Sequence, residues 1–237
     1  MKTQYEISYR KLKIFSNIKR RYREYLLLAS DRKLMQSNPN ALLNAFIAQK
    51  AVFVHIPKTA GISLVKSIYG ENIERGGHRK ITHISKLMPG PLNDYFTFTI
   101  IRNPWDRLYS AYKFMMNGGI NQHDENAFNL HLSSINSFED FVMNWLHENN
   151  LKHIIHFYPQ SWFLKDNSEK VELDFIGRFE YLSSDFAKIA NKIGVENKLK
   201  HLNKGDKRSY KTVYNQEMKE KVKLIYKEDI ERFKYTF

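Results

Sequence analysis

The chain has 237 residues, no cysteine and a formal net charge of +13. Its length and its 42% content of hydrophobic residues exclude a disordered chain and favour one domain with a substantial core. The lack of cysteine excludes disulfides and cysteine-based zinc sites, and the absence of a long apolar run argues against a membrane span or a signal peptide. We therefore expect a cytoplasmic protein with a polyanionic partner.

Residues 1–40 are predicted to form a basic helical extension before a domain that spans residues 41–237. Apolar and basic residues interleave at helical spacing over residues 5–34, and residues 1–35 hold ten Lys or Arg against three Asp or Glu. Two interpretations stay open. The helix packs on the domain with a solvated basic face, which we prefer, or it makes a peripheral contact with the inner face of an anionic membrane.

A strand, a tight turn and a helix follow one another in residues 51–70. The apolar run 51–54 is typical of a buried strand, the turn carries Lys58 and Gly61, and residues 62–69 have helical spacing. Backbone N–H groups and the dipole at a helix start attract anions, and Lys58 adds a mobile positive charge. The segment therefore predicts a phosphate or sulfate site. It is not a Walker A loop, because Lys58 precedes the glycine.

A second strand end carries further groups suited to a phosphate. Residues 95–101 are apolar enough for a strand buried on both faces, and Arg102 follows them. Asn103 and Asp106 resemble a capping box for the next helix, which carries Ser110. Arg offers a planar fork of charged donors, and Ser adds a hydroxyl donor. Because ligands of open α/β sheets bind at the carboxyl ends of strands, we expect both strand ends to share one ligand.

The remaining residues are predicted to complete an α/β fold. The expected elements are a polar loop over residues 120–136, helices over residues 138–147, 185–193 (capped by Ser183 and Ser184) and 216–233, and a third strand over residues 171–179. His153 and His156 lie three residues apart, but no third ligand accompanies them. We therefore expect no metal site.

A family resemblance appears at both strand ends. Sulfotransferases that use 3′-phosphoadenylyl sulfate (PAPS) have a 5′-phosphosulfate loop that resembles Pro57-Lys58-Thr59-Ala60-Gly61-Ile62-Ser63. The form HIPKTAG is similar to the branch that sulfates carbohydrates, typified by heparan sulfate 2-O- and chondroitin 4-O-sulfotransferases. Arg102 and Ser110 have the spacing with which this family holds a 3′-phosphate. The resemblance covers roughly residues 50–237 and implies a bacterial member, because animal members usually carry a membrane anchor that this chain does not show.

The resemblance implies a P-loop-NTPase-like three-layer sandwich, with a central parallel sheet flanked by helices. It also implies transfer of a sulfuryl group from PAPS to a carbohydrate or glycan hydroxyl by in-line displacement, without a metal and with adenosine 3′,5′-bisphosphate as product. The implied donor contacts are Lys58, Thr59, Ala60, Gly61, Ile62, Ser63, Arg102, Ser110 and, in a late basic loop, Lys204 and Arg208. Ile62 stands where relatives commonly have Thr, so one hydroxyl contact is missing.

The resemblance further implies that Lys58 is catalytic and that a histidine is the general base. Lys58 would neutralise charge on the bridging oxygen of the leaving group. His78 is the favoured base, because it lies between the two donor motifs in a Gly-Gly-His segment, as in the heparan and dermatan 2-O-sulfotransferases. His83 is the second candidate, His55 is expected to order the loop, and an Asp or Glu base stays open.

Two other functions stay open from the residues alone. A kinase or another nucleotide-dependent NTPase has little support, because neither a Walker A loop nor a metal-binding carboxylate after a strand is visible. A non-catalytic module that binds polyanions would fit the positive net charge. A basic surface patch is enough for such binding, however, and does not require two predicted phosphate sites at the ends of strands. We expect a glycan or another hydroxyl acceptor, with the basic surface favouring an acidic one, and no nucleic-acid partner, because no nucleic-acid motif is present.

Overall fold

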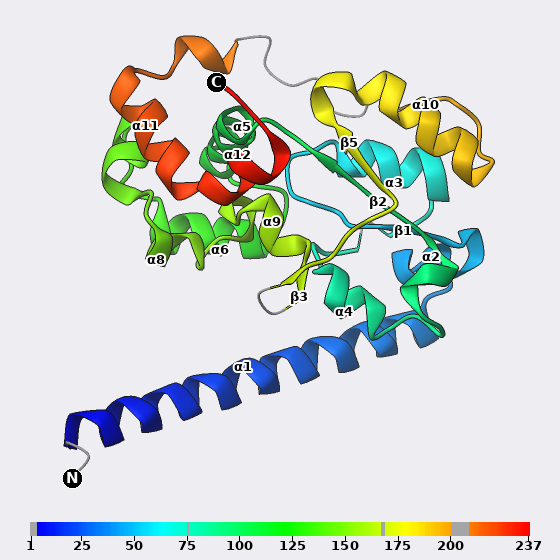
Figure 1. Ribbon diagram of the computed structural model, residues 1–237, viewed down its shortest axis with the longest axis horizontal. Coiled ribbons are helices and arrows are strands. Elements are labelled where there is room, and N and C mark those ends of the chain that lie inside the picture. Colours follow the sequence, from blue (N-terminus) through cyan, green and yellow to red (C-terminus); the bar gives the residue numbers. More distant parts are fainter. Residues whose placement is uncertain (1–3, 75, 167–168, 201–208) are drawn as a thin grey trace.

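Three parallel strands form the centre of the computed structural model, which describes residues 4–74, 76–166, 169–200 and 209–237. β1 (Ala51–Phe53), β2 (Phe96–Ile101) and β5 (Phe175–Arg178) pair in the order β1-β2-β5 (Figure 1). All pairs are parallel, so the carboxyl ends of the strands lie at one edge. This arrangement confirms the predicted α/β fold. The third strand is shorter than predicted, because only residues 175–178 pair with β2.

Helices flank the sheet on both sides. α2 (Leu42–Gln49) packs on β1, α10 (Leu182–Ile193) packs on β5, and α3 (Gly61–Tyr69) follows β1. In the view of Figure 1, α3 and α10 lie above the strands, and α4 (Ile81–Ser85) lies below them. Strand residues such as Val52 and Phe98 are fully buried, as expected for a parallel sheet that is covered on both faces.

A second, helical core lies beside the sheet. α5 (Pro104–Met116) begins directly after β2 and packs against α11 (Gln216–Ile225). Aromatic rings fill much of this core, and the ring of Phe141 contacts those of Tyr112, Trp145 and Phe157. The other elements are η1 (Leu92–Asp94), α6 (Gln122–His131), α7 (Phe138–Asp140), the π-helix η2 (Phe141–Trp145), α8 (Glu148–Leu151), η3 (Ile155–Phe157), α9 (Gln160–Phe163), β3 (Lys165–Asp166), β4 (Glu169–Lys170), η4 (Phe179–Tyr181), η5 (Tyr210–Thr212) and α12 (Lys227–Phe233).

Two of the predicted elements around the helical core are wrong in type. The segment predicted as a loop over residues 120–136 contains α6, because the Asn121 side chain caps this helix by accepting the backbone N–H of Asp124. The helix predicted over residues 138–147 begins as α7 but continues as the π-helix η2. Within η2 the ring of Phe141 stacks on that of Trp145, with an angle of 20° between the ring planes.

Predicted helix ends also differ from the structure. The closing helix is divided into α11 and α12 at Tyr226, a buried residue whose hydroxyl donates to the carbonyl oxygen of Phe157. α10 begins at Leu182, and its serines do not cap it, since the Ser184 hydroxyl donates to the carbonyl oxygen of Tyr181. At α5 the Asn103 cap is confirmed. Asp106 does not complete a capping box, because its carboxylate binds Arg102.

The predicted N-terminal helix is confirmed as α1 (Gln4–Ser37). Figure 1 shows that α1 runs below the sheet and that its N-terminal part extends beyond the rest of the chain. Within the part of the chain that the structure describes, no helix combines the length and the apolar content that crossing a membrane requires.

Buried polar groups connect the helical core to the end of β2. Arg107 is fully buried and donates to the carbonyl oxygens of His156 and Tyr158, at 3.1 and 2.6 Å. Asp229 is also fully buried, and it accepts the backbone N–H groups of Gln160 and Ser161, at 2.6 and 2.7 Å. Burial raises the pKa of Asp229, while the positive charge of Arg107 opposes this effect. Asp229 thereby fixes the start of α9.

The substitution Asp229→Ala removes an acceptor that two buried N–H groups share. We expect the free energy of unfolding to fall by about 3 kcal/mol, because unpaired buried polar groups are costly. Urea denaturation measures this change. Glu228→Ala is the control, since the Glu228 carboxylate binds Lys165 at the surface and its loss costs less than about 1 kcal/mol. Equal losses for the two variants would show that Asp229 has no special structural role.

Candidate active site

The turn between β1 and α3 forms a cradle of backbone N–H groups. Lys58 and Ala60 adopt the left-handed conformation, with φ of 69° and 66°. Successive N–H groups then point into one concavity, which is the geometry of an anion-binding nest. No side chain caps α3, and among the described residues no acceptor receives the backbone N–H groups of residues 58–63. The turn therefore combines free donors with the positive end of the α3 dipole.

Close packing explains two residues of this turn. A Cβ atom at Gly61 would lie only 1.9 Å from the imidazole of His55, so glycine is required there. The Thr59 side chain is buried, and its hydroxyl donates to the carbonyl oxygen of Ile56 at 2.9 Å. The Thr59 hydroxyl thus orders the loop, and its backbone N–H is the group available to a ligand.

Arg102 joins the two predicted anion-binding segments. Its Nη1 donates to the carbonyl oxygen of Lys58 at 3.1 Å, while Nε and Nη2 bind the carboxylate of Asp106. These bonds use three of the five N–H donors of the guanidinium group. The ring of Phe179 lies 4.0 Å from the guanidinium carbon. The fork is therefore held in one orientation, and two of its N–H donors have no acceptor among the residues that the structure describes.

The main chain of Arg102 is fixed by an amide side chain. The fully buried Gln160 accepts the backbone N–H of Arg102 and donates to its carbonyl oxygen, both at 2.9 Å. Since Asp229 in turn holds the backbone of Gln160, the end of β2 is anchored in the helical core.

The Lys58 side chain lies in the same region. Its Nζ is 4.1 Å from the centre of the Phe114 ring, and no carboxylate of the described residues pairs with it. Burial, and then the nearby charge of Arg102, lower the pKa of Lys58 to about 8. An anion that enters beside Lys58 would therefore meet a cation without a competing partner.

The other predicted donor contacts are less well defined. Ser63 is buried in the first turn of α3, and Ile62 beside it is half-buried. Ser110 is half-buried on α5, and among the described residues it forms no hydrogen bond with Arg102. Lys204 and Arg208 lie outside the described residues.

The predicted base, His78, lies against the anion-binding turn. Its Nδ1 is 2.9 Å from the carbonyl oxygen of His55. A carbonyl oxygen can only accept, so Nδ1 carries the proton and the lone pair is on Nε2. Nε2 makes no hydrogen bond within the described part of the chain. Burial lowers the pKa of His78 to about 4, so the imidazole is neutral at neutral pH. These properties suit a proton acceptor.

The other two histidines singled out in this region have different surroundings. His55 stacks on Phe53, its ring lies 4.4 Å from that of His78, and burial lowers its pKa well below the usual value. It packs under Gly61, as expected of a residue that orders the loop. His83, the second candidate base, is buried with its Nε2 2.7 Å from Asp31 of α1. It is therefore held by the N-terminal helix.

A buried pair beside His78, His156 and Asp124, is not found by the sequence analysis. His156 Nε2 lies 2.9 Å from the Asp124 carboxylate, and the His156 ring is 5.6 Å from that of His78. The same ring packs 4.7 Å from Phe114, the ring under Lys58. The sequence contains the His153-x-x-His156 spacing, which predicts no site without a third ligand, and the polar stretch around Asp124, which predicts a loop.

Local hydrogen bonds and close packing fix the position of the Asp124 carboxylate beside His156. The backbone N–H of Ile120 and the side chain of Asn121 both donate to its carboxylate. Gly119 has φ of +68°, and a Cβ there would lie 2.1 Å from that of Asp124. Burial alone would raise the pKa of Asp124, but its hydrogen bonds, chiefly that with His156, hold this pKa below the usual value. Asp124 is therefore a buried carboxylate with a fixed direction.

Comparison with known proteins identifies the family of this chain. The family model described as "Sulfotransferase family" matches residues 48–236, which include every element from β1 to α12. The chain belongs to the sulfotransferase family. It is also similar to an uncharacterized protein from Archaeoglobus fulgidus, with 34% identity over 106 residues, or 44% of this chain and 72% of that protein. No solved structure matches the chain.

Family membership explains the geometry of this sulfotransferase in general terms. Sulfotransferases transfer sulfuryl groups, and they have a P-loop-like α/β fold in which a sheet is flanked by helices. The β1-loop-α3 segment and the end of β2 both lie within the matched residues.

The lowered pKa of Lys58 predicts its reactivity. Only a neutral amine attacks an acylating reagent, so labelling of Lys58 should rise with pH and level off above about pH 9, one unit above its pKa of about 8. An ordinary lysine, with a pKa near 10.4, continues to gain reactivity up to about pH 11. Mass spectrometry of digested, pulse-labelled protein follows each lysine, and Lys58→Arg identifies the peptide. A Lys58 rate that still rises beyond pH 10 would contradict the lowered pKa.

Proposed function

We propose that this sulfotransferase uses PAPS as donor and a carbohydrate hydroxyl as acceptor, with His78 as the general base. The observation that carries the proposal is the hydrogen bond from Arg102 to the Lys58 carbonyl, because it joins two anion-binding strand ends. A nucleotide with phosphate on both its 3′ and 5′ positions requires two such groups close together.

The residues present suit this donor. The N–H groups from Lys58 to Ser63 would hold the 5′-phosphosulfate, and the Lys58 side chain would balance its charge. The two remaining N–H donors of Arg102 would hold the 3′-phosphate, with Ser110 beside it. Lys204 and Arg208 are proposed as further contacts by their likeness to the basic loop of relatives.

The proposed reaction is an in-line displacement at sulfur. His78 Nε2 would take the proton of the acceptor hydroxyl while its oxygen forms a bond to sulfur. Lys58 would neutralise the bridging oxygen as the bond between sulfur and the 5′-phosphate breaks. The anionic donor beside His78 favours the protonated imidazole and raises its pKa from about 4 toward the working pH.

Asp124 and His156 would act as positioning residues in this reaction. His156 packs against both Phe114 and His78, so its ring limits the positions of Lys58 and of the base. The Asp124 carboxylate fixes the tautomer of His156, because it accepts the proton on Nε2. Its negative charge also favours protonation of His78 during the transfer.

The acceptor proposed is an acidic glycan. The net charge of +13 suits a polyanion, and the HIPKTAG turn with the Gly-Gly-His segment resembles the carbohydrate branch of the family. This finer assignment extends the family membership from sulfuryl transfer in general to one class of acceptor.

Donor binding is the first test. Calorimetric titration should give much tighter binding of adenosine 3′,5′-bisphosphate than of AMP, and Arg102→Ala should abolish this preference because it removes the 3′-phosphate donors. Binding should weaken about tenfold or more between pH 7 and pH 9.5 as Lys58 loses its charge, but not in Lys58→Arg, whose guanidinium stays charged. ATP is the control ligand. A preference for ATP, or equal binding of AMP and the bisphosphate, would overturn the proposed donor.

The base is tested by transfer of radiolabelled sulfate from PAPS to desulfated heparan, chondroitin and a neutral glucan. His78→Ala should lower the turnover rate by about a hundredfold to ten-thousandfold, the usual contribution of a general base, and leave bisphosphate binding unchanged. His147→Ala is the matched control, since His147 is exposed at the start of α8. Full activity of His78→Ala would refute His78 as the base. Transfer to the neutral glucan alone would refute the acidic acceptor.

A further inference from the structure

One side of α1 is fixed to the domain by ion pairs. Asp31 is buried, and its carboxylate binds the Arg79 guanidinium at 2.8 and 3.0 Å and His83 at 2.7 Å. Two turns earlier, on the same side of the helix, Glu24 pairs with Lys86. Leu28 and Met35 pack against the sheet core. Glu24 and Asp31 thus both face the domain.

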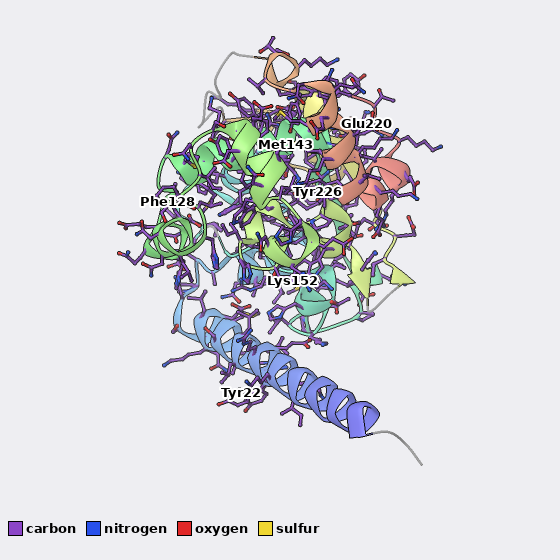
Figure 2. All side chains as sticks on the ribbon, turned by 90° about the vertical axis from the view of Figure 1, so that its left-hand side faces the viewer. Tyr22, Phe128, Met143, Lys152, Glu220 and Tyr226 are labelled. Atoms are coloured by element: carbon purple, nitrogen blue, oxygen red, sulfur yellow. The ribbon has the colours of Figure 1, made fainter. Side chains whose placement is uncertain are left out.

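The opposite side of α1 carries an exposed apolar stripe. Ile18, Tyr22, Tyr25 and Leu26 follow the spacing i, i+4, i+7 and i+8 of a single helix face. Their exposed fractions are 57%, 61%, 63% and 47%, which are high for large apolar side chains. Figure 2 shows Tyr22 on the side of α1 turned away from the rest of the chain.

Positive charge surrounds this stripe. The exposed charged residues described on α1 are all basic, namely Lys19, Arg21, Arg23, Arg32 and Lys33. Because Glu24 and Asp31 are turned to the domain and paired, the outward side of the described helix presents apolar and positively charged groups together. Such a surface is complementary to one that is apolar beneath a negatively charged layer.

We infer that the outward side of α1 binds an anionic lipid surface, with the helix lying in the plane of that surface. The stripe of Ile18, Tyr22, Tyr25 and Leu26 would enter the boundary between headgroups and acyl chains. Arg and Lys side chains at its borders reach the lipid phosphates while their methylene stems stay apolar. The two tyrosines suit this depth, because one end of each side chain is apolar and the other is polar.

Two other partners fit the outward side of α1 less well than a lipid surface does. A second copy of the chain would bring two positively charged helix sides together with no acidic partner among their described outward residues, which is repulsive. Nucleic acid would satisfy the charges but would leave the apolar stripe without a partner. The inference rests on α1 alone and is independent of the proposed donor, acceptor and base.

Co-sedimentation of the full chain with vesicles tests this inference. We expect binding to phosphatidylcholine vesicles that contain phosphatidylglycerol, little binding to phosphatidylcholine alone, and release by high salt. Tyr22→Ser with Tyr25→Ser should weaken binding at least tenfold through loss of the apolar stripe. Arg21→Gln alone should weaken it about fivefold, the effect of one cation near an anionic surface.

The matched control carries Tyr181→Ser with Leu224→Ser, because these side chains are 64% and 74% exposed on other elements. It should bind vesicles as the natural chain does, and unchanged circular dichroism and thermal midpoints show that all variants fold. Three results would overturn the inference: equal binding to both kinds of vesicle, a dimer in light scattering that Tyr22→Ser with Tyr25→Ser abolishes, or tighter binding to DNA than to anionic vesicles.

Discussion

The guanidinium group of Arg102 holds the candidate site together. It connects the end of β2 to the turn after β1 through the Lys58 carbonyl, and Asp106 and Phe179 keep its plane in one orientation. The turn contains two left-handed residues without glycine, Lys58 and Ala60, a conformation that is costly unless its surroundings fix it. The hydrogen bond from Arg102 and the buried Thr59 hydroxyl supply that restraint. The anion-binding geometry thus depends on a contact between two distant segments.

The site divides into a positive part and a neutral part. Lys58 and Arg102 supply positive charge where the turn directs its N–H groups, whereas His55 and His78 are kept neutral by burial. The Phe114 ring lies against both the Lys58 ammonium group and the His156 ring, at 4.1 and 4.7 Å. Positively charged and neutral groups therefore lie side by side in the candidate site.

Local patterns predicted the three strands of the parallel sheet, α3, α5 and the meeting of Lys58 with Arg102, because each depends on short-range spacing and on the rule that parallel strands end at one edge. They did not predict the short pair β3 and β4. The sequence did not predict α6, since its polar residues have no clear apolar face and a single cap at Asn121 decides its start. Asp124 and His156 were missed for a related reason. They lie 32 residues apart, and only tertiary packing around Gly119 and Arg107 brings them together.

The side chain of Gln160 takes the place of a neighbouring strand at the carboxyl end of β2. Its amide meets the N–H and the carbonyl oxygen of Arg102 as a peptide group of an adjacent strand would, so the backbone ladder is continued by one side chain. An amide does not titrate at any physiological pH. The main chain at Arg102 consequently keeps its position at any physiological pH, at the carboxyl end of the central strand of the three-stranded sheet.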